Sequence, residues 1–138
     1  MKRIAVLDDY QGEVPSLPYW ARLADRASVD VFRDTLADES ALARRLREYE
    51  IIVPIRERTS FRASLLDRLS SLELLALTGR NSGHVDVEAA TARGILVTET
   101  EGSGASAVEH TMALLLAIVR RIPQDDRAMR SSLTSRSR

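Results

Sequence analysis

The sequence predicts an α/β fold in which a parallel five-stranded sheet is flanked by helices. Short apolar runs recur along the chain, and the first of them, residues 4–7, is continuous rather than alternating, as expected of a strand covered on both faces. Segments with helical periodicity separate these runs, so that the strands recur at a spacing of roughly twenty residues. Strands that alternate with helices in this way form right-handed crossovers, and repeated crossovers build a parallel sheet.

Five apolar segments are the predicted strands. The first is followed by two aspartates, and the third is closed by Pro54, which cannot donate a hydrogen bond to a β ladder. In chain order the predicted strands are residues 4–7, 29–32, 51–53, 74–77 and 95–97. A single sheet with the flavodoxin-like order 2-1-3-4-5 is the architecture that these segments favour.

Two helices are predicted between the first and third strands. Ser16 or Pro18 is expected to begin the first helix, since proline is favoured at the first helical position. Thr35 or Asp38 is expected to cap the second helix. The stripes turned inward would be Trp20, Leu23 and Ala27 in the first helix and Leu42, Leu46 and Tyr49 in the second.

Two further helices are predicted between the third and fifth strands. Ser60 is expected to cap a short helix that turns leucines inward. Asp86 is expected to cap the next helix, and Gly94 stands where a helix commonly ends in a C′ glycine.

The long helix predicted from Ala105 to Arg121 differs from the others because it is apolar almost all round. Helices of this kind are usually buried on every side. A domain of five strands and four helices can cover only one side of this helix. A second domain or another subunit should therefore cover the remainder. The chain past Pro123 is polar and lacks periodicity, which predicts a disordered tail over residues 123–138.

The composition excludes several kinds of site. The 138 residues include no cysteine, so there is no disulfide, thiolate metal site or cysteine nucleophile. The formal net charge is zero, which gives no electrostatic reason to expect nucleic acid or an anionic membrane as partner. Residues 111–119 form the longest uncharged apolar stretch, and a membrane span needs about 20 residues. We expect a cytoplasmic protein.

The polar loop after the fourth predicted strand is the expected ligand-binding edge. In open α/β proteins, ligands bind just beyond the carboxyl ends of such strands. Arginine side chains and free loop amides would suit a small carboxylate or phosphate, although simple solvation would account for the same charges. The residues expected at this edge are Asp8, Asp9, Arg33, Arg56, Arg58, Thr78, Gly79, Arg80, Asn81 and Glu99.

Two other patterns indicate a site but lack the groups that the site would need. Asp8 and Asp9 would suit a phosphoreceiver domain, which also needs an aspartate after the third strand and a lysine after the fifth. Lys2 is the only lysine, so solvation or local capping is the favoured role of these aspartates. Residues 102–107, GSGASA, match a dinucleotide fingerprint, but no acidic strand follows, and a hinge is favoured instead. No metal site is predicted, and the histidines are expected to cap or pack.

Four segments together resemble the D-isomer-specific 2-hydroxyacid dehydrogenases, the group of phosphoglycerate dehydrogenase and hydroxypyruvate reductase. The resemblance is to the N-terminal, substrate-binding half of these enzymes. The segments are residues 51–56 (IIVPIR), 74–86 (LLALTGRNSGHVD), 92–97 (ARGILV) and 106–117 (SAVEHTMALLLA). The last is similar to the family's S-V-A-E-H-T-L-A-L-L-L segment, which opens the helix that crosses to the cofactor domain.

The resemblance implies a substrate-binding site in this chain. The family holds the substrate carboxylate with backbone amides of the loop after the fourth strand, here Thr78, Gly79 and Arg80. The arginine after the third strand, here Arg56, would lie beside the same cleft. The loop departs from the family's usual G-x-G-x-D-x-I-D pattern at Asn81, Gly83 and Val85.

The resemblance also implies a catalytic apparatus that the 138 residues do not include. The family's glycine-rich NAD motif follows the long helix, and its catalytic arginine, glutamate and histidine lie further on. In such enzymes the arginine polarises the substrate carbonyl, a glutamate-paired histidine shuttles the proton, and NADH delivers hydride. We therefore expect no catalytic residue in this chain, and no binding of NAD or NADP by this chain alone.

Two hypotheses about function follow. The leading one is a truncated NAD-dependent D-2-hydroxyacid dehydrogenase, inactive alone and dimeric through the helix of residues 105–121. Its parts would be a substrate-binding domain (1–100), a hinge and crossover helix toward an absent Rossmann domain (101–122) and the tail. The alternative is a stand-alone small-anion-binding or oligomerisation module, which would bury the long helix in a defined dimer.

Overall fold

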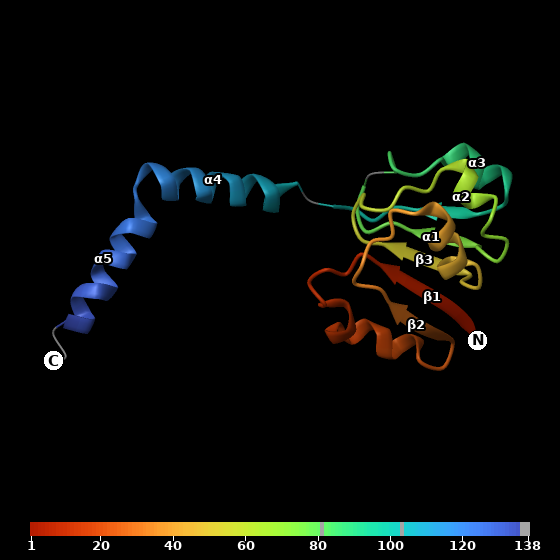
Figure 1. Ribbon diagram of the computed structural model, residues 1–138, viewed down its shortest axis with the longest axis horizontal. Helices are drawn as coiled ribbons and strands as arrows, with labels where there is room; N and C mark the ends of the chain where they lie inside the picture. Colours follow the sequence, from red (N-terminus) through yellow and green to blue (C-terminus); the bar gives the residue numbers. More distant parts are fainter. Residues whose placement is uncertain (81, 103, 136–138) are drawn as a thin grey trace. The chain divides into compact units, whose positions relative to one another are not determined.

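A computed structural model describes residues 1–80, 82–102 and 104–135 of the chain. The chain divides into two units, Met1–Glu101 and Gly102–Arg138. The first unit contains a five-stranded sheet of order β2-β1-β3-β4-β5 in which every neighbouring pair is parallel (Figure 1). The strands are β1 (Lys2–Leu7), β2 (Ala27–Val31), β3 (Ile51–Pro54), β4 (Leu74–Ala76) and β5 (Leu96–Thr98). The predicted fold class and strand order are confirmed.

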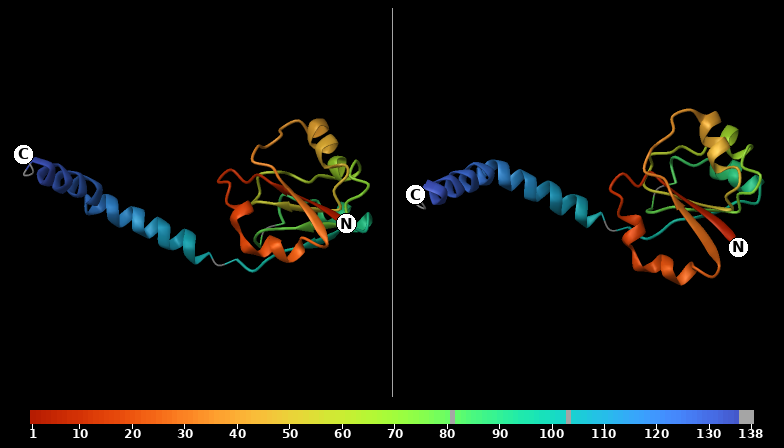
Figure 2. Two further views of the ribbon diagram at one scale, coloured as in Figure 1. Left: turned by 90° about the horizontal axis from the view of Figure 1, so that it is seen from below. Right: turned by 60° about the horizontal axis from the view of Figure 1, so that its bottom comes forward.

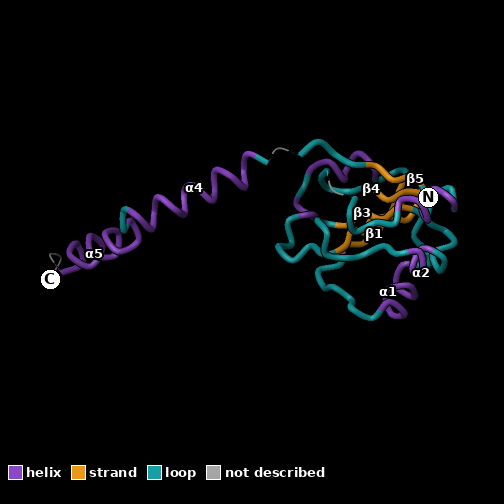
Figure 3. The backbone as a smooth tube through the Cα atoms, turned by 90° about the horizontal axis from the view of Figure 1, so that it is seen from above, coloured by secondary structure: helices purple, strands orange, loops and turns teal. Residues whose placement is uncertain are grey.

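The helices of the first unit lie on both faces of the sheet. They are the 3-10 helices η1 (Val14–Ser16) and η2 (Pro18–Leu23) and the α-helices α1 (Glu39–Leu46), α2 (Ala63–Leu66) and α3 (Val87–Ala92). Figure 2 shows the 3-10 helices and α1 on opposite sides of β1. Helices α1 and α2 lie side by side (Figure 3), where the Ser64 hydroxyl donates to Glu39 Oε2 at 2.8 Å.

The core consists of two apolar layers, one on each face of the sheet. Ala5 and Leu7 of β1 belong to the larger layer, together with leucines of α1 and α2. Ile4 and Val6, the alternate residues of the same strand, belong to the smaller layer against the 3-10 helices. The continuous apolar run of β1 therefore reflects a strand whose two faces are both buried.

Two of the predicted helix signals are confirmed as caps. The Asp38 carboxylate accepts hydrogen bonds from the amides of Ser40 and Ala41 and begins α1, so Asp38 rather than Thr35 is the cap. The Asp86 carboxylate accepts from the amide of Ala89 at 2.9 Å and begins α3. Gly94 follows α3 with a φ of +73°, the left-handed conformation expected of a C′ glycine.

The helix predicted to begin at Ser16 or Pro18 is confirmed in part, because a helix begins at Pro18 and packs Trp20 and Leu23 against the smaller core layer, but it is a short 3-10 helix. A separate 3-10 helix, η1, precedes it, and Ala27 belongs to β2 instead of to a helix face. Leu17, between the two 3-10 helices, is extended, with φ −72° and ψ 127°. A residue that precedes proline is driven out of the helical region, so Pro18 prevents one continuous α-helix here.

The predicted cap of the short third helix is also wrong. Arg62 is the N-cap residue of α2, and no side chain caps this helix. The chain at Phe61 is extended because it pairs with Val85: the Phe61 amide donates to the His84 carbonyl at 2.8 Å. This long-range pairing delays the start of the helix beyond Ser60.

The second unit contains two helices, α4 (Ala105–Val119) and α5 (Ile122–Ser135). Helix α5 corrects the prediction of a disordered tail for these residues, while residues 136–138 lie outside the described part. Asp126 and Arg130 form an ion pair one turn apart at 2.9 Å, and the Arg127 Nε donates to the Pro123 carbonyl. Side-chain contacts between residues four apart stabilise a helix, even where the sequence lacks the long apolar stripe from which a helix is usually predicted.

The apolar residues of α4 are exposed in this chain. Val108 is 63 % exposed, Leu115 is 52 % exposed and Ile118 is 72 % exposed. The expectation that another domain or subunit covers this helix stays a prediction. Among the described residues, no helix is both long enough and apolar enough to cross a bilayer.

Candidate functional site

The loops that follow β1, β3, β4 and β5 emerge at the carboxyl edge of the sheet. Leu7 of β1 pairs with Pro54 of β3, and Ala76 of β4 pairs with Thr98 of β5, so the strands end at nearly the same level. In open α/β sheets this edge is where ligands bind. The four predicted substrate-binding residues all follow strands at this edge: Arg56 after β3 and Thr78, Gly79 and Arg80 after β4.

One hydroxyl joins the loop after β3 to the loop after β4. Thr78 Oγ1 accepts a hydrogen bond from the Arg56 amide at 3.2 Å and donates one to the Pro54 carbonyl at 3.1 Å. Arg56 has a φ of +60°, a left-handed conformation that non-glycine residues adopt at a cost. The structure therefore brings two of the four predicted residues, Arg56 and Thr78, into direct contact.

The loop after β4 presents unpaired backbone donors. Within the described part of the chain, the amides of Thr78, Gly79 and Arg80 donate to no other group. Gly79 has a φ of +150°, and its carbonyl accepts from the Thr100 amide at 3.4 Å. A Cβ at Gly79 would meet no atom within 4 Å, so the backbone conformation and not a lack of space favours glycine here.

One arginine side chain in the loop after β3 and one in the loop after β4 are unpaired in the part of the chain that the structure describes. The side chains of Arg56 and Arg80 are exposed, and neither has an ion-pair or hydrogen-bond partner among the described residues. Arg58 is engaged instead: its Nη1 donates to the Asp8 carbonyl at 2.6 Å, and its guanidinium lies 4.2 Å from the centre of the Tyr10 ring. Asn81, also expected in this loop, lies outside the described residues.

The aspartates after β1 differ from each other in role. Asp9 is a local cap, as predicted, since its carboxylate accepts from the amides of Glu13 and Val14. Asp8 is not solvated as expected: it is only 1 % exposed. Its carboxylate accepts from the hydroxyls of Thr35 and Thr59.

No sequence signal pointed to this arrangement around Asp8. Its two threonine partners lie 27 and 51 residues further along the chain, so spacing along the sequence could not connect them.

Among the described residues, no group of acidic or histidine side chains could hold a metal ion.

The segment that matches a dinucleotide fingerprint does not fit a dinucleotide. Gly102 and Gly104 each leave open space where a Cβ would stand, so no neighbouring protein atom requires glycine at either position. Helix α4 then leads to α5, and no strand with an acidic residue follows within the described residues. Ser103 of this segment lies outside the described part.

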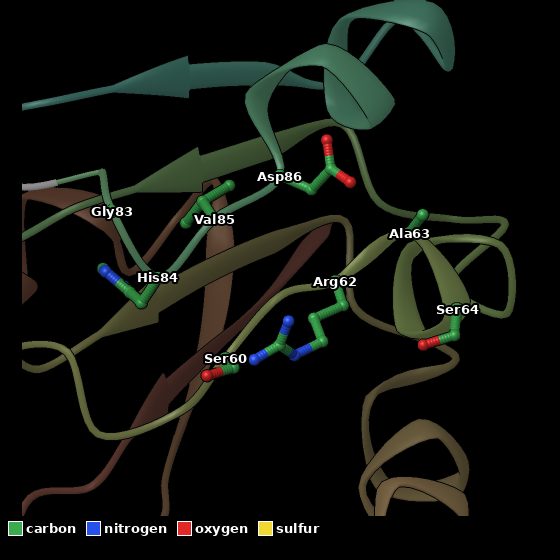
Figure 4. Close-up of a pocket in the computed structure, with 8 residues that line it drawn as sticks. All are labelled: Ser60, Arg62, Ala63, Ser64, Gly83, His84, Val85 and Asp86. Carbon is green, nitrogen blue, oxygen red and sulfur yellow. The ribbon is translucent and has the colours of Figure 1, made fainter.

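A separate pocket of about 430 Å³ lies between residues of the segments 60–64 and 83–86 (Figure 4). Asp86 is already used as the cap of α3, and the His84 ring points away from Arg62 and Ser64. The His84 ring packs edge-on against Phe61, with ring centroids 6.5 Å apart. This agrees with a packing role for the histidine.

The family model of the D-isomer-specific 2-hydroxyacid dehydrogenase catalytic domain matches residues 4–138. The chain belongs to this family of dehydrogenases. A D-3-phosphoglycerate dehydrogenase of Archaeoglobus fulgidus is 35 % identical over 98 residues, which are 70 % of this chain and 18 % of the relative. That of Mycobacterium tuberculosis H37Rv is 42 % identical over 84 residues, 60 % of this chain and 16 % of the relative.

Solved dehydrogenase structures share the fold. A phosphoglycerate oxidoreductase from Vibrio cholerae O395 is 40 % identical, with a TM-score of 0.80 over 89 % of this chain and 39 % of that chain. A D-lactate dehydrogenase from Aquifex aeolicus, solved with NAD and lactic acid, is 22 % identical and shares the fold with a TM-score of 0.63 over 89 % of this chain and 35 % of that chain. The 138-residue chain thus spans less than a fifth of the first two dehydrogenase relatives and about two fifths of the Vibrio structure.

Proposed function

We propose that this chain is the substrate-binding part of a nicotinamide-dependent oxidoreductase that interconverts D-2-hydroxy acids and 2-keto acids. The observation that carries the proposal is the row of unpaired amides at Thr78, Gly79 and Arg80, in a loop tied to Arg56. Family membership supports the reaction class, and the relatives named D-3-phosphoglycerate dehydrogenase support an acidic substrate.

The proposed contact is between the substrate carboxylate and this loop. Amide donors that point to one place form an anion-binding concavity, and a guanidinium adds a fork that matches a carboxylate. The chain as a whole is neutral, so the attraction must be local to these loops. Arg56 and Arg80 both have side chains free to take part.

The transfer of hydride and proton is not assigned to these residues. A nicotinamide, when bound to the enzyme, would supply or accept the hydride. The segment 102–107 does not fit a dinucleotide, and the carboxyl edge offers no histidine paired with a carboxylate among the described residues. In our proposal the described residues of this chain bind and orient the substrate acid, and the chemistry belongs to groups outside them.

Titration of the 138-residue chain with glycolate, the smallest 2-hydroxy acid, tests the binding proposal. We expect saturable chemical-shift changes at the amides of residues 78–80, with a dissociation constant of about 1–10 mM, as suits a few exposed contacts. Arg56→Gln should weaken binding several-fold, whereas the matched exposed variant Arg22→Gln on η2 should not. Glycolate that leaves these amides unchanged would contradict the proposal.

An activity assay tests where the chemistry lies. The purified 138-residue chain, mixed with NADH or NADPH and a 2-keto acid such as glyoxylate, should show no cofactor oxidation above the background rate. A measurable rate would show that these residues carry the catalytic groups and would overturn this part of the proposal.

We further propose that α4 is the contact of a homodimer. Its exposed apolar side chains support this, since contiguous apolar surface commonly marks an interface. Light scattering of the wild type should give the mass of two chains. The Leu115→Glu variant should give the mass of one chain. The control Met129→Glu, at an exposed position of α5, should leave the dimer intact. A monodisperse wild-type monomer would contradict the proposal.

A further inference from the structure

The buried aspartate after β1 has an unusual environment for a carboxylate. Asp8 is 1 % exposed and adopts a left-handed φ of +65°. One carboxylate oxygen accepts from the Thr59 hydroxyl at 2.7 Å, and the other accepts from the Thr35 hydroxyl. A buried carboxylate is costly unless it is hydrogen-bonded, and bonds to an ionised acceptor are stronger than neutral ones. These bonds therefore fasten the segments that carry Thr35 and Thr59 to the end of β1.

The two threonines belong to different loops. Thr59 lies in the segment of residues 55–60, which also carries Arg56, whereas Thr35 lies between β2 and α1. Tyr10 forms a further hydrogen bond with the hydroxyl of Thr35. Asp8 thus connects the end of β1 to the segment that carries Arg56 through one oxygen, and to the loop between β2 and α1 through the other.

Hydrogen bonds fasten the segment of residues 55–60 on both sides of Arg56. Before it, the Ile55 amide donates to the Leu7 carbonyl at 3.1 Å. After it, Arg58 Nη1 donates to the Asp8 carbonyl at 2.6 Å and Thr59 donates to the Asp8 carboxylate. Since Arg56 itself has a left-handed backbone, its conformation persists only where neighbouring bonds over-determine it.

We propose that Asp8 is a positioning residue for the substrate-binding edge. Through Thr59 and Arg58 it holds the loop in the conformation that places Arg56 against Thr78. The inference rests on the proposed function, because it assumes that this edge binds a carboxylate. Asp8 itself is buried below the loop and is not a substrate ligand.

The two threonines provide a matched pair of variants. Thr59→Val and Thr35→Val each remove one hydroxyl from the same carboxylate with almost no change in volume. Thr59→Val should weaken glycolate binding by roughly five-fold, the loss expected when a loop-fixing hydrogen bond is removed. The affinity of Thr35→Val for glycolate should stay within about two-fold of that of the wild type, since the loop of Thr35 carries no residue proposed to contact the substrate. Thr59→Ser, which restores the hydroxyl, should bind as the wild type does.

Amide hydrogen exchange gives a readout that needs no ligand. The Arg56 amide is bonded to Thr78 Oγ1, so its exchange reports whether the loop stays fastened. We expect faster exchange at Arg56 in Thr59→Val and an unchanged rate in Thr35→Val, with thermal unfolding showing that both are folded. Should Thr59→Val not fold, Arg58→Lys removes the Nη1 hydrogen bond to the Asp8 carbonyl, keeps the charge and should show the same direction of change in the exchange rate at Arg56.

The outcomes separate this inference from the proposed function. Equal effects of the two valine variants on binding and on exchange would reduce Asp8 to a general structural residue and overturn the inference. Wild-type protein that does not bind glycolate would overturn the proposed function, while the exchange comparison would still decide whether Asp8 fastens the loop. Binding that is unchanged in Thr59→Val would leave the proposed function standing and refute the positioning role.

Discussion

At the scale of single residues, backbone conformation limits which substitutions the loop after β4 can tolerate. Gly79→Ala would place a Cβ in open space, so the cost comes from the φ of +150° alone. We expect a loss of about 1–3 kcal/mol in the free energy of unfolding, measured by urea denaturation. Gly102→Ala, where no left-handed φ is needed and a Cβ also meets open space, is the control. Equal stability of the two variants would argue against the strain.

Acid sensitivity is a second property of individual residues. The backbone hydrogen bond from the Arg3 amide to Glu50 Oε2, 2.7 Å long, lowers the pKa of Glu50 below its ordinary value of 4.5. A lowered pKa in the folded state means that the stabilisation is present above pH 4.5 and is lost as the pH falls through the folded value. Arg45 lowers the pKa of Asp34 in the same way, through hydrogen bonds of 3.0 and 2.8 Å.

Thermal unfolding as a function of pH tests this. The midpoint of the wild type should fall on acidification below about pH 4.5, and the decrease should be smaller in Glu50→Gln because that variant has already lost the ionised acceptor. Asp34→Asn should act in the same direction. If the unfolding midpoint of Glu50→Gln fell as much on acidification as that of the wild type, carboxyl groups other than Glu50 would control the acid sensitivity.

At the scale of elements, the sequence predicts those features that depend on neighbours along the chain. Short apolar segments identified all five strands, and Asp38 and Asp86 were found as caps because a cap bonds to amides two or three residues away. The start of α2 was missed because Phe61 pairs with Val85, a contact between distant segments. Helix α5 was missed because ion pairs and not an apolar stripe accompany it.

The same distinction applies to the candidate site. The loop of Thr78, Gly79 and Arg80 was predicted from its place after a strand and from the family resemblance. The environment of Asp8 could not be predicted, since its partners come from two other loops. Burial of a charged residue depends on the whole fold and not on its local sequence.

The cap of α1 supports a prediction at this scale. Asp38→Ala removes the acceptor of two amide hydrogen bonds, of 3.2 and 2.9 Å, and should lower the free energy of unfolding by about 1 kcal/mol. Asp25→Ala, at an exposed aspartate between η2 and β2, is the matched control and should change it far less. Chemical denaturation measures both, and a silent Asp38→Ala would contradict the capping role.

At the scale of the whole molecule, the two units differ in how they are stabilised. Both core layers consist of residues up to Val97, all within the first unit. The unit Met1–Glu101 should therefore fold alone, with an unfolding midpoint within a few degrees of that of the full chain, measured by circular dichroism. A fragment that is unfolded would show that residues after 101 are needed for the core.

The hydroxyl of Thr78 has a consequence for how sequences of this kind can change. It accepts from the loop after β3 and donates to the last residue of that same strand, at positions 22 and 24 residues away. A relative that loses this hydroxyl must satisfy the Arg56 amide and the Pro54 carbonyl in another way. Residue 78 and the segment around Arg56 are therefore expected to vary together among relatives, with serine as the one neutral exchange at residue 78.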